Sequence, residues 1–469
     1  MEFYKTITMK KILFACSLFI TLSMLGQNYP IGHTTIVFED PNRGNREIET
    51  EIYYPATAAG DDTPGAIGQF PVIVFGHGFV MAWSAYENLW EEFVSRGYIM
   101  AFPRTEGNAF STDHQEFGWD LQFLVTAIQD EGDDPVSVLH ELVSSETALM
   151  GHSMGGGASF LAADSLVTNG NTNLKTLIGL APAESSTNGV SSIASATQIT
   201  LPSLILSGVQ DGVTPPVDHH IPMYDNLASD CKTIIHVIGG AHCYFANPNT
   251  ACDFGESTSS SGISITRQEQ HEVTFDFVNL WLDYTLKSDC NDFSTFSDSL
   301  SNSPRINYDQ VCNVSITTID TSVTSSTFNL EANQSGATYQ WIDCADNSPI
   351  PGETSAIFEP QTDGDFAVEI TMNGCTSVSN CHTFQTASIS EEISNGFLNL
   401  YPNPSNGSFI IESNSNYNLQ IYDAQGNLVQ ESKINTGENQ ISTRLNSGIY
   451  FWKASNTHAE IQTGKLLIR

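Results

Sequence analysis

The sequence has few basic residues: 17 lysines and arginines stand against 53 aspartates and glutamates, a formal net charge of −36. This shortage argues against nucleic acids and anionic membranes as partners, because both attract cationic surfaces. After residue 26 the chain also lacks an apolar run long enough to span a bilayer. Cysteines, histidines and carboxylates nowhere cluster at metal-ligand spacing, even beside His219 and His220, so we expect no metal and no cofactor.

The first 26 residues have the composition of a secretory signal peptide. Lys5, Lys10 and Lys11 precede an apolar stretch, residues 12–25, that is short for a membrane span. The chain has nine cysteines, of which one lies in this segment. Disulfides are expected among the other cysteines of an exported chain. We therefore predict a secreted or cell-surface protein and expect a monomer.

Residues 30–287 alternate short apolar strands with helices, which is the pattern of an α/β fold. The predicted fold class is an α/β-hydrolase with a mostly parallel sheet and helices on both faces, followed by two small all-β sandwich domains. We expect strands at residues 34–39, 47–54, 71–76, 98–102, 146–150, 176–180, 203–207 and 233–237. We expect helices at residues 85–95, 115–129, 154–165, 221–228 and 268–286.

The stretch Met150-Gly151-His152-Ser153-Met154-Gly155-Gly156-Gly157 places a Gly-x-Ser-x-Gly motif between an expected strand and an expected helix. This is the arrangement of a nucleophile elbow. Gly151 and Gly155 lack the Cβ that would clash in the sharp turn, which lifts the Ser153 hydroxyl onto the edge of the sheet. The turn also directs the Met154 N–H toward a developing oxyanion. The alternative interpretation is an ordinary glycine-rich turn.

An acid and a histidine follow in the order that such an elbow requires. Asp211 lies in a loop of glycine and proline after an apolar strand, and His242 lies in the loop that leaves the next strand. Singly, each has a plainer interpretation, a turn aspartate and a surface histidine. Together they predict a triad, in which His242 takes the Ser153 proton and Asp211 orients and stabilises the imidazole.

The loop after the third expected strand supplies the second oxyanion donor in this interpretation. Gly78 permits a close approach of the backbone, and the Phe79 N–H is the partner of the Met154 N–H. The Phe79 ring then forms a wall of the acyl pocket. Val213, beside Asp211, is a further candidate for substrate contact. Few residues separate the sixth strand from Asp211, so we expect an open cleft without a lid.

These motifs resemble the cutinase-like polyester hydrolases, a group that includes polyethylene terephthalate hydrolases and related triacylglycerol lipases. The resemblance covers roughly residues 65–313. Besides the serine motif it depends on Ala181-Pro182 with residues 185–188, on Asp211 with Ala228-Ser229, and on Gly239-Gly240-Ala241-His242 with Ala246-Asn247. Upstream, residues 32–34 and 53–56 look more like platelet-activating-factor acetylhydrolases and chlorophyllase- or dienelactone-hydrolase-like enzymes, although Ser153 argues against the cysteine nucleophile of the last group.

One position departs from the polyester hydrolases. The group usually has a tryptophan after Ala-Pro, which clamps an aromatic ring of the substrate, and here that position is Ala183. Tyr244 and Phe245 in the histidine loop could restore an aromatic wall, although a lone aromatic pair more often belongs to the core. The substrate-binding candidates are therefore Phe79, Ala183, Val213, Tyr244 and Phe245.

The cysteines suggest two disulfides in the catalytic domain. Cys243 and Cys252 flank the loop just after His242, and a disulfide there would hold that loop. Cys290 and Cys312 bracket a polar stretch and resemble the C-terminal disulfide pair of the polyester hydrolases. Cys231 has no evident partner. The pairing among Cys344, Cys375 and Cys381 stays open.

The chain beyond the catalytic domain changes in composition. The expected domains are a signal peptide (1–26), the catalytic domain (27–313), an immunoglobulin-like domain (314–388) and a third unit (396–469). The third unit resembles the C-terminal sorting domain of type IX secretion substrates, which implies recognition by that machinery and passage across an outer membrane. Its alternative is a carbohydrate-binding sandwich.

The leading functional hypothesis is a secreted serine esterase that cleaves polyester, cutin or lipid-type esters through an acyl-enzyme on Ser153. One alternative is an esterase for small soluble esters that resembles the acetylhydrolases. An alternative from a different class is a surface adhesin whose hydrolase domain is an inactive scaffold.

Overall fold

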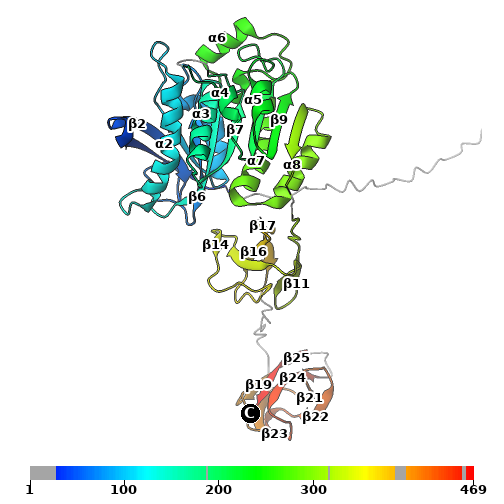
Figure 1. Cartoon of the computed structure of the whole chain (residues 1–469). Coiled ribbons are helices and arrows are strands. Elements are labelled where there is room, and N and C mark those ends of the chain that lie inside the picture. Colours follow the sequence, from blue (N-terminus) through cyan, green and yellow to red (C-terminus); the bar gives the residue numbers. More distant parts are fainter. Residues whose placement is uncertain (1–27, 186–188, 315–316, 386–397, 457–460) are drawn as a thin grey trace, which may run out of the picture. The chain divides into compact units, whose positions relative to one another are not determined.

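The computed structural model describes residues 28–185, 189–314, 317–385, 398–456 and 461–469 (Figure 1). The expected signal peptide lies outside these ranges, as do three residues of the motif at 185–188. In the described ranges no helix combines the length and hydropathy of a membrane span. The chain divides into two compact units, Met1–Thr386 and Ala387–Arg469.

A ten-stranded sheet organises the first unit, in the order β10-β9-β8-β7-β6-β4-β5-β2-β1-β3. Neighbouring strands from β9 to β5 run parallel. β10 and β2 pair antiparallel with their neighbours, whereas β1 pairs antiparallel with β2 and parallel with β3. The strands are β1 (Ile31–Asp40), β2 (Arg46–Pro55), β3 (Gly60–Asp61), β4 (Phe70–Gly76), β5 (Ile99–Pro103), β6 (Val143–His152), β7 (Leu174–Leu180), β8 (Ser203–Gly208), β9 (Cys231–Val237) and β10 (Ile306–Cys312).

The sheet is thus mixed, which corrects the expectation of a mostly parallel sheet. The physical reason at one edge is the connection between β1 and β2. Only five residues, 41–45, separate these strands, and three of them form a 3-10 turn. A parallel pair needs a crossover of a dozen or more residues, so a connection this short makes an antiparallel hairpin.

Helices pack on both faces of the sheet, as Figure 1 shows. Alternate residues of β4 lie in two separate cores: Val72 and Val74 in one, Ile73 and Phe75 in the other. This follows from the period of two along a strand. The first core contains α2, α3 and α5 residues, and the second contains α1, α7 and α8 residues. The helices are α1 (Glu87–Ser95), α2 (His114–Asp133), α3 (Met154–Thr168), α4 (Ser192–Ala196), α5 (His220–Asn226), α6 (Thr250–Ser259), α7 (Arg267–Lys287) and α8 (Cys290–Asn302).

All eight expected strands and all five expected helices are present, with boundaries that differ by a few residues. The structure adds elements that the sequence interpretation missed, chiefly α6, α8 and β10. α8 occupies the stretch that was interpreted only as polar. Its buried residues include Phe293, Phe296 and Leu300, which share one helix face at spacings of three and four.

Residues 317–385 are rich in β-strands that form two sheets, β11-β12-β15 and a second sheet in which β13 pairs with β14 and β16, and β16 with β17 and β18. Trp341 is fully buried in their core. The strands are β11 (Val323–Ser325), β12 (Leu330–Ala332), β13 (Thr338–Asp343), β14 (Ser348–Pro349), β15 (Ile357–Phe358), β16 (Gly364–Met372), β17 (Cys375–Val378) and β18 (His382–Phe384).

The second unit also consists of two sheets, β19-β20-β23 and β22-β21-β24-β25. Its core is built from alternate residues such as Leu419 and Ile421 of β21 with Trp452 and Ala454 of β24. The strands are β19 (Leu398–Tyr401), β20 (Ser408–Ser413), β21 (Tyr417–Tyr422), β22 (Leu428–Ile434), β23 (Gly437–Ser442), β24 (Gly448–Ser455) and β25 (Ile461–Ile468).

Eight cysteines form four disulfides, and one expected pairing is wrong. Cys243 pairs with Cys252 as expected, whereas Cys290 and Cys312 do not pair with each other. Cys312 is bonded to Cys231, because β10 pairs with β9 in a register that places these two residues opposite each other. Cys290 is bonded instead to Cys375 of β17, and Cys344 to Cys381.

Candidate active site

The nucleophile elbow is formed where β6 ends at His152 and α3 begins at Met154. Ser153 lies between them with φ 54° and ψ −119°, a strained conformation for a residue with a side chain. A Cβ added to Gly155 would lie 2.6 Å from the His77 carbonyl oxygen and closer still to Gly76. The Gly155 N–H donates to that His77 oxygen at 3.0 Å. The glycine therefore lets the loop after β4 lie directly against the elbow.

The three residues of the expected triad lie in one hydrogen-bonded chain. His242 Nε2 is 2.9 Å from Ser153 Oγ, and His242 Nδ1 is 2.8 Å from Asp211 Oδ2. Asp211 follows β8 and His242 follows β9, so both come from the carboxyl edge of the sheet, as Ser153 does. All three side chains are buried, and Ser153 is the most exposed at 8%. This order and geometry match the requirements for an activated serine.

Asp211 is held as a carboxylate. Burial by itself raises the pKa of this group, but the hydrogen bond and charge of His242 outweigh it, so the pKa of Asp211 is lowered from its ordinary value. Oδ1 accepts the backbone N–H groups of Val213 and Thr214 at 2.9 and 2.8 Å. An ionised, fixed Asp211 can hold the His242 ring with its Nδ1 protonated and its Nε2 free to accept.

Several residues that sequence reasoning missed hold the His242 loop. Gln270 of α7 bonds both the N–H and the carbonyl of Ala241, at 2.8 and 2.9 Å. The Glu256 carboxylate of α6 accepts the Cys243 N–H at 2.6 Å, and Arg267 donates to the Cys243 carbonyl. Gln270 stands 29 residues after Ala241, and no motif in the sequence signals such a contact.

Two further buried histidines flank the triad. The His152 ring is hydrogen-bonded on both sides. Its Nε2 lies 3.0 Å from the His242 carbonyl oxygen, and its Nδ1 lies 2.9 Å from the Tyr86 hydroxyl. His220 lies on the other side, with its Nε2 3.9 Å from Asp211 Oδ2. Burial lowers the pKa of each to about 3, so both are neutral at physiological pH. Since a carbonyl oxygen can only accept, the single proton of the neutral His152 ring is on Nε2, which donates to the His242 carbonyl.

These buried histidines predict a loss of stability in acid. Between pH 6.5, their ordinary pKa, and about 3, the unfolded chain binds protons that folded His152 and His220 do not. The free energy of unfolding therefore falls as pH decreases through this window. Urea unfolding at pH 7 and 4.5 measures this change. Between the two pH values, the free energy of unfolding should fall less in His220→Gln than in the wild type. An equal loss in both proteins would contradict the assignment of His220 as buried and neutral.

The expected oxyanion donors lie in the two segments that meet at the elbow. Met154 opens α3, and Phe79 lies in the loop after β4. Gly78 N–H donates to the Tyr86 hydroxyl at 2.8 Å, which fixes this loop. Among the described residues, neither the Phe79 nor the Met154 N–H has a hydrogen-bond acceptor. Both are therefore available to an anionic oxygen.

The expected substrate-contacting side chains separate into two groups. The Phe79 ring is 50% exposed, and Ala183 and Val213 are partly exposed. The Ala183 N–H donates to the Ser153 carbonyl at 2.8 Å, so this residue lies beside Ser153. The expectation that Phe245 contacts the substrate is corrected by the structure. Phe245 is fully buried and packs near the His152 ring, so it offers no wall to a substrate. One face of Tyr244 is covered by the Arg267 guanidinium, 4.6 Å from the ring centroid.

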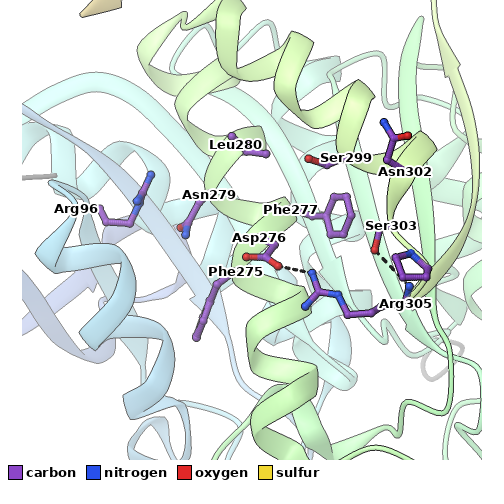
Figure 2. A pocket seen from close by; sticks show the side chains of 11 residues that line it. Arg96, Phe275, Asp276, Phe277, Asn279, Leu280, Ser299, Asn302, Ser303 and Arg305 are labelled. Atoms are coloured by element: carbon purple, nitrogen blue, oxygen red, sulfur yellow. Dashed lines mark hydrogen bonds and ion pairs between the residues drawn. The ribbon is translucent and has the colours of Figure 1, made fainter. Parts of the chain in front are cut away.

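A hollow of about 540 Å³ lies elsewhere in the first unit, and Figure 2 shows its lining. Its side chains come from α7, α8 and the loop before β10, with Arg96 beyond them. Arg305 forms an ion pair with Asp276 across part of it. None of its lining residues belongs to the loops that carry Ser153, Asp211 and His242, so this hollow is not part of the candidate site. In the described ranges no group of three or more histidine, cysteine or carboxylate side chains is arranged to hold a metal ion.

Two parts of the chain match known protein families. Residues 46–263 match the model of the PET hydrolase-like family. Residues 399–469 match the secretion system C-terminal sorting domain. The first match implies an ester hydrolase and includes Ser153, Asp211 and His242. The second indicates export by type IX secretion machinery to the extracellular space or the cell surface. The resemblances to the polyethylene terephthalate hydrolases and to the sorting domain are thereby confirmed.

Proposed function

We propose that this exported chain, with PET hydrolase-like residues 46–263, is a serine ester hydrolase that forms an acyl-enzyme on Ser153. The observation that carries the proposal is the continuous hydrogen-bonded chain from Ser153 through His242 to Asp211 at a strained elbow. A positive φ at a serine costs stability, so we would not expect an inactive scaffold to retain this arrangement. We assign the catalytic machinery to residues 27–313.

The proposed reaction follows from the positions of the donors and acceptors. His242 Nε2 takes the proton of Ser153 Oγ as the oxygen attacks the ester carbonyl carbon. The Phe79 and Met154 N–H groups bind the oxyanion that forms. His242 then gives the proton to the departing alcohol. Water, activated by the same histidine, releases the acid and restores Ser153.

We propose aliphatic carboxylic esters, including polymeric and lipid-type esters, as the substrates. With Phe245 buried and one face of the partly exposed Tyr244 covered by Arg267, Phe79 is the most exposed aromatic side chain among the substrate candidates. Ala183 leaves space where the resembled hydrolases place an aromatic clamp. An enzyme exported from the cell also meets esters that are too large to be imported.

A fluorophosphonate probe tests the serine mechanism directly. It should attach to one residue, Ser153, and peptide mass spectrometry of the labelled full chain should locate it there. His242→Gln should lose labelling, because the hydroxyl is then no longer activated. Labelling of another serine, or none in a protein that hydrolyses p-nitrophenyl butyrate, would contradict the proposal. The absence of both labelling and hydrolysis would favour the adhesin alternative.

A panel of esters tests the substrate class. It should run from acetyl and butyryl esters through tributyrin to films of an aliphatic and an aromatic polyester. We expect turnover of butyryl esters, tributyrin and the aliphatic film. Hydrolysis restricted to acetyl esters in solution would favour the acetylhydrolase-like alternative instead.

Ala183→Trp should shift the preference toward aromatic polyesters. Ring stacking contributes about 0.5–1.5 kcal/mol beyond area burial, or roughly three- to tenfold in a rate constant. The measurement is the ratio of product release from an aromatic polyester film to turnover of p-nitrophenyl butyrate. Ala345→Trp, at an exposed site outside the catalytic domain, controls for adsorption of any new tryptophan to the film. An unchanged ratio in a folded Ala183→Trp protein, or equal gains in both variants, would count against a substrate ring beside Ala183.

A further inference from the structure

Asp211 has buried partners besides His242. Thr214 Oγ1 lies 2.9 Å from Asp211 Oδ2, and His220 Nε2 lies 3.1 Å from Thr214 Oγ1. His220 Nδ1 is in turn 2.7 Å from Ser207 Oγ. His220 is fully buried and Thr214 is 5% exposed. Three more side chains, Thr214, His220 and Ser207, thus extend the triad beyond Asp211, and we call them the extension. None of them has a role in the proposed reaction.

The proton positions along this extension are determined by its ends. Thr214 Oγ1 also lies 3.3 Å from the Ala181 carbonyl oxygen and 2.8 Å from His242 Nδ1. We assign its single hydroxyl proton to Asp211 Oδ2, because an ionised carboxylate can only accept and this contact, 2.9 Å, is shorter than the one to Ala181. Thr214 Oγ1 then accepts from His220, which requires the proton of the neutral imidazole to be on Nε2. The unprotonated Nδ1 of His220 accepts the Ser207 hydroxyl proton. Every donor in the series Ser207, His220, Thr214 therefore points toward Asp211.

We propose that Thr214 and His220 are positioning residues that orient Asp211 toward His242 and moderate its basicity, an inference that rests on the proposed serine mechanism. Thr214 binds the same oxygen, Oδ2, that accepts the His242 Nδ1–H. It thereby fixes the rotation of the carboxylate and shares its negative charge. His220 holds the Thr214 hydroxyl in the orientation that this requires. Oriented hydrogen bonds of this kind reinforce one another in a buried site.

The extension has a distinct consequence for the dependence of the rate on pH. Without the Thr214 donor, the charge on Asp211 is more concentrated, and it stabilises the protonated His242 more strongly. The acidic limb of the kcat/KM profile then moves to higher pH. Apart from His220, the other titratable groups around His242 are His152, which stays neutral, His219, whose pKa is lowered by burial, Glu256 bonded to the Cys243 N–H, and Arg267 bonded to the Cys243 carbonyl. None of these is altered by a change at Thr214.

The test compares Thr214→Val with Thr214→Ser in the full chain, using p-nitrophenyl butyrate from pH 5 to 9. Thr214→Val keeps the side-chain shape and removes the hydroxyl. We expect kcat to fall about tenfold or more, with KM within about twofold and the acidic limb displaced upward by about half a pH unit. Thr214→Ser restores the donor and should recover most of the rate and the original limb. Thr50→Val, a buried threonine of β2 bonded to the Ile48 carbonyl, should leave all three quantities unchanged.

Replacements of His220 provide the second, independent arm. His220→Leu removes the donor to Thr214, whereas His220→Gln retains one, so the first should reproduce the Thr214→Val profile more closely than the second. A stable Thr214→Val protein with wild-type kcat and an unmoved acidic limb would overturn the inference. If Thr214→Val does not fold, a folded His220→Leu protein with wild-type kcat and an unmoved acidic limb would overturn it instead. If Ser153→Ala also keeps its turnover, the proposed function itself is wrong; if Ser153→Ala is inactive, only the role of the extension is lost.

Discussion

Ser153→Ala should lower kcat on a soluble ester by about a millionfold, which is the scale of loss when the nucleophile of a triad is removed. The reason is that the hydroxyl supplies the attacking oxygen, and His242 and Asp211 act only through it. KM should change little, because the oxyanion donors and the substrate wall remain. Turnover of p-nitrophenyl butyrate by the purified full chain measures the effect.

Ser165→Ala is the matched control for this substitution. Ser165 lies on the same helix, α3, is partly exposed, and its hydroxyl accepts a bond from Asn169. Its replacement should leave kcat and the unfolding midpoint unchanged. If Ser153→Ala instead kept more than about a thousandth of the wild-type rate, another nucleophile would have to be sought, because the residual activity of a triad without its serine is far smaller.

Gly155→Ala should destabilise the protein by about 1–3 kcal/mol or more, which is the range that overpacking of a well-packed interior costs. The added Cβ would meet backbone atoms of Gly76 and His77, which cannot rotate away. The loop after β4 would have to separate from the elbow, and the Phe79 N–H would move with it. Urea unfolding measures the stability, and ester turnover should fall in the protein that remains folded.

Gly255→Ala is the control, because it makes the same chemical change where a Cβ meets nothing within 4 Å. Gly255 lies inside α6, so alanine there should stabilise the protein by about 0.5–1 kcal/mol. Equal behaviour of the two variants would contradict the close contact between the elbow and the β4 loop.

The positions of the triad could be predicted because they depend on short-range patterns. Each residue follows an apolar strand, and loops after parallel neighbouring strands meet at one edge of the sheet. Chain order then assigned the acid and the base. The hydrogen bonds that complete the site could not be predicted in this way. Gln270 and Glu256 reach the His242 loop from helices whose packing is determined by the whole domain.

The errors in the sequence interpretation have physical causes. Phe245 was assigned to the substrate because an aromatic residue in a catalytic loop can face either way, and here the 3-10 turn at Cys243–Phe245 buries it. The pairing of Cys312 required the register of β10 against β9. α8 was missed because its polar face dominates its composition, although its apolar residues follow helical spacing.

The disulfides also determine where a single proteolytic cut can release the sorting domain. The Cys290–Cys375 disulfide closes a loop over residues 290–375, and the Cys344–Cys381 disulfide closes an overlapping loop over residues 344–381. A chain nicked anywhere from residue 290 to residue 381 would therefore remain one covalent molecule under oxidising conditions. It would migrate as one band on a non-reducing gel and as two bands after reduction. A protease that frees the enzyme from its C-terminal unit must cut after Cys381.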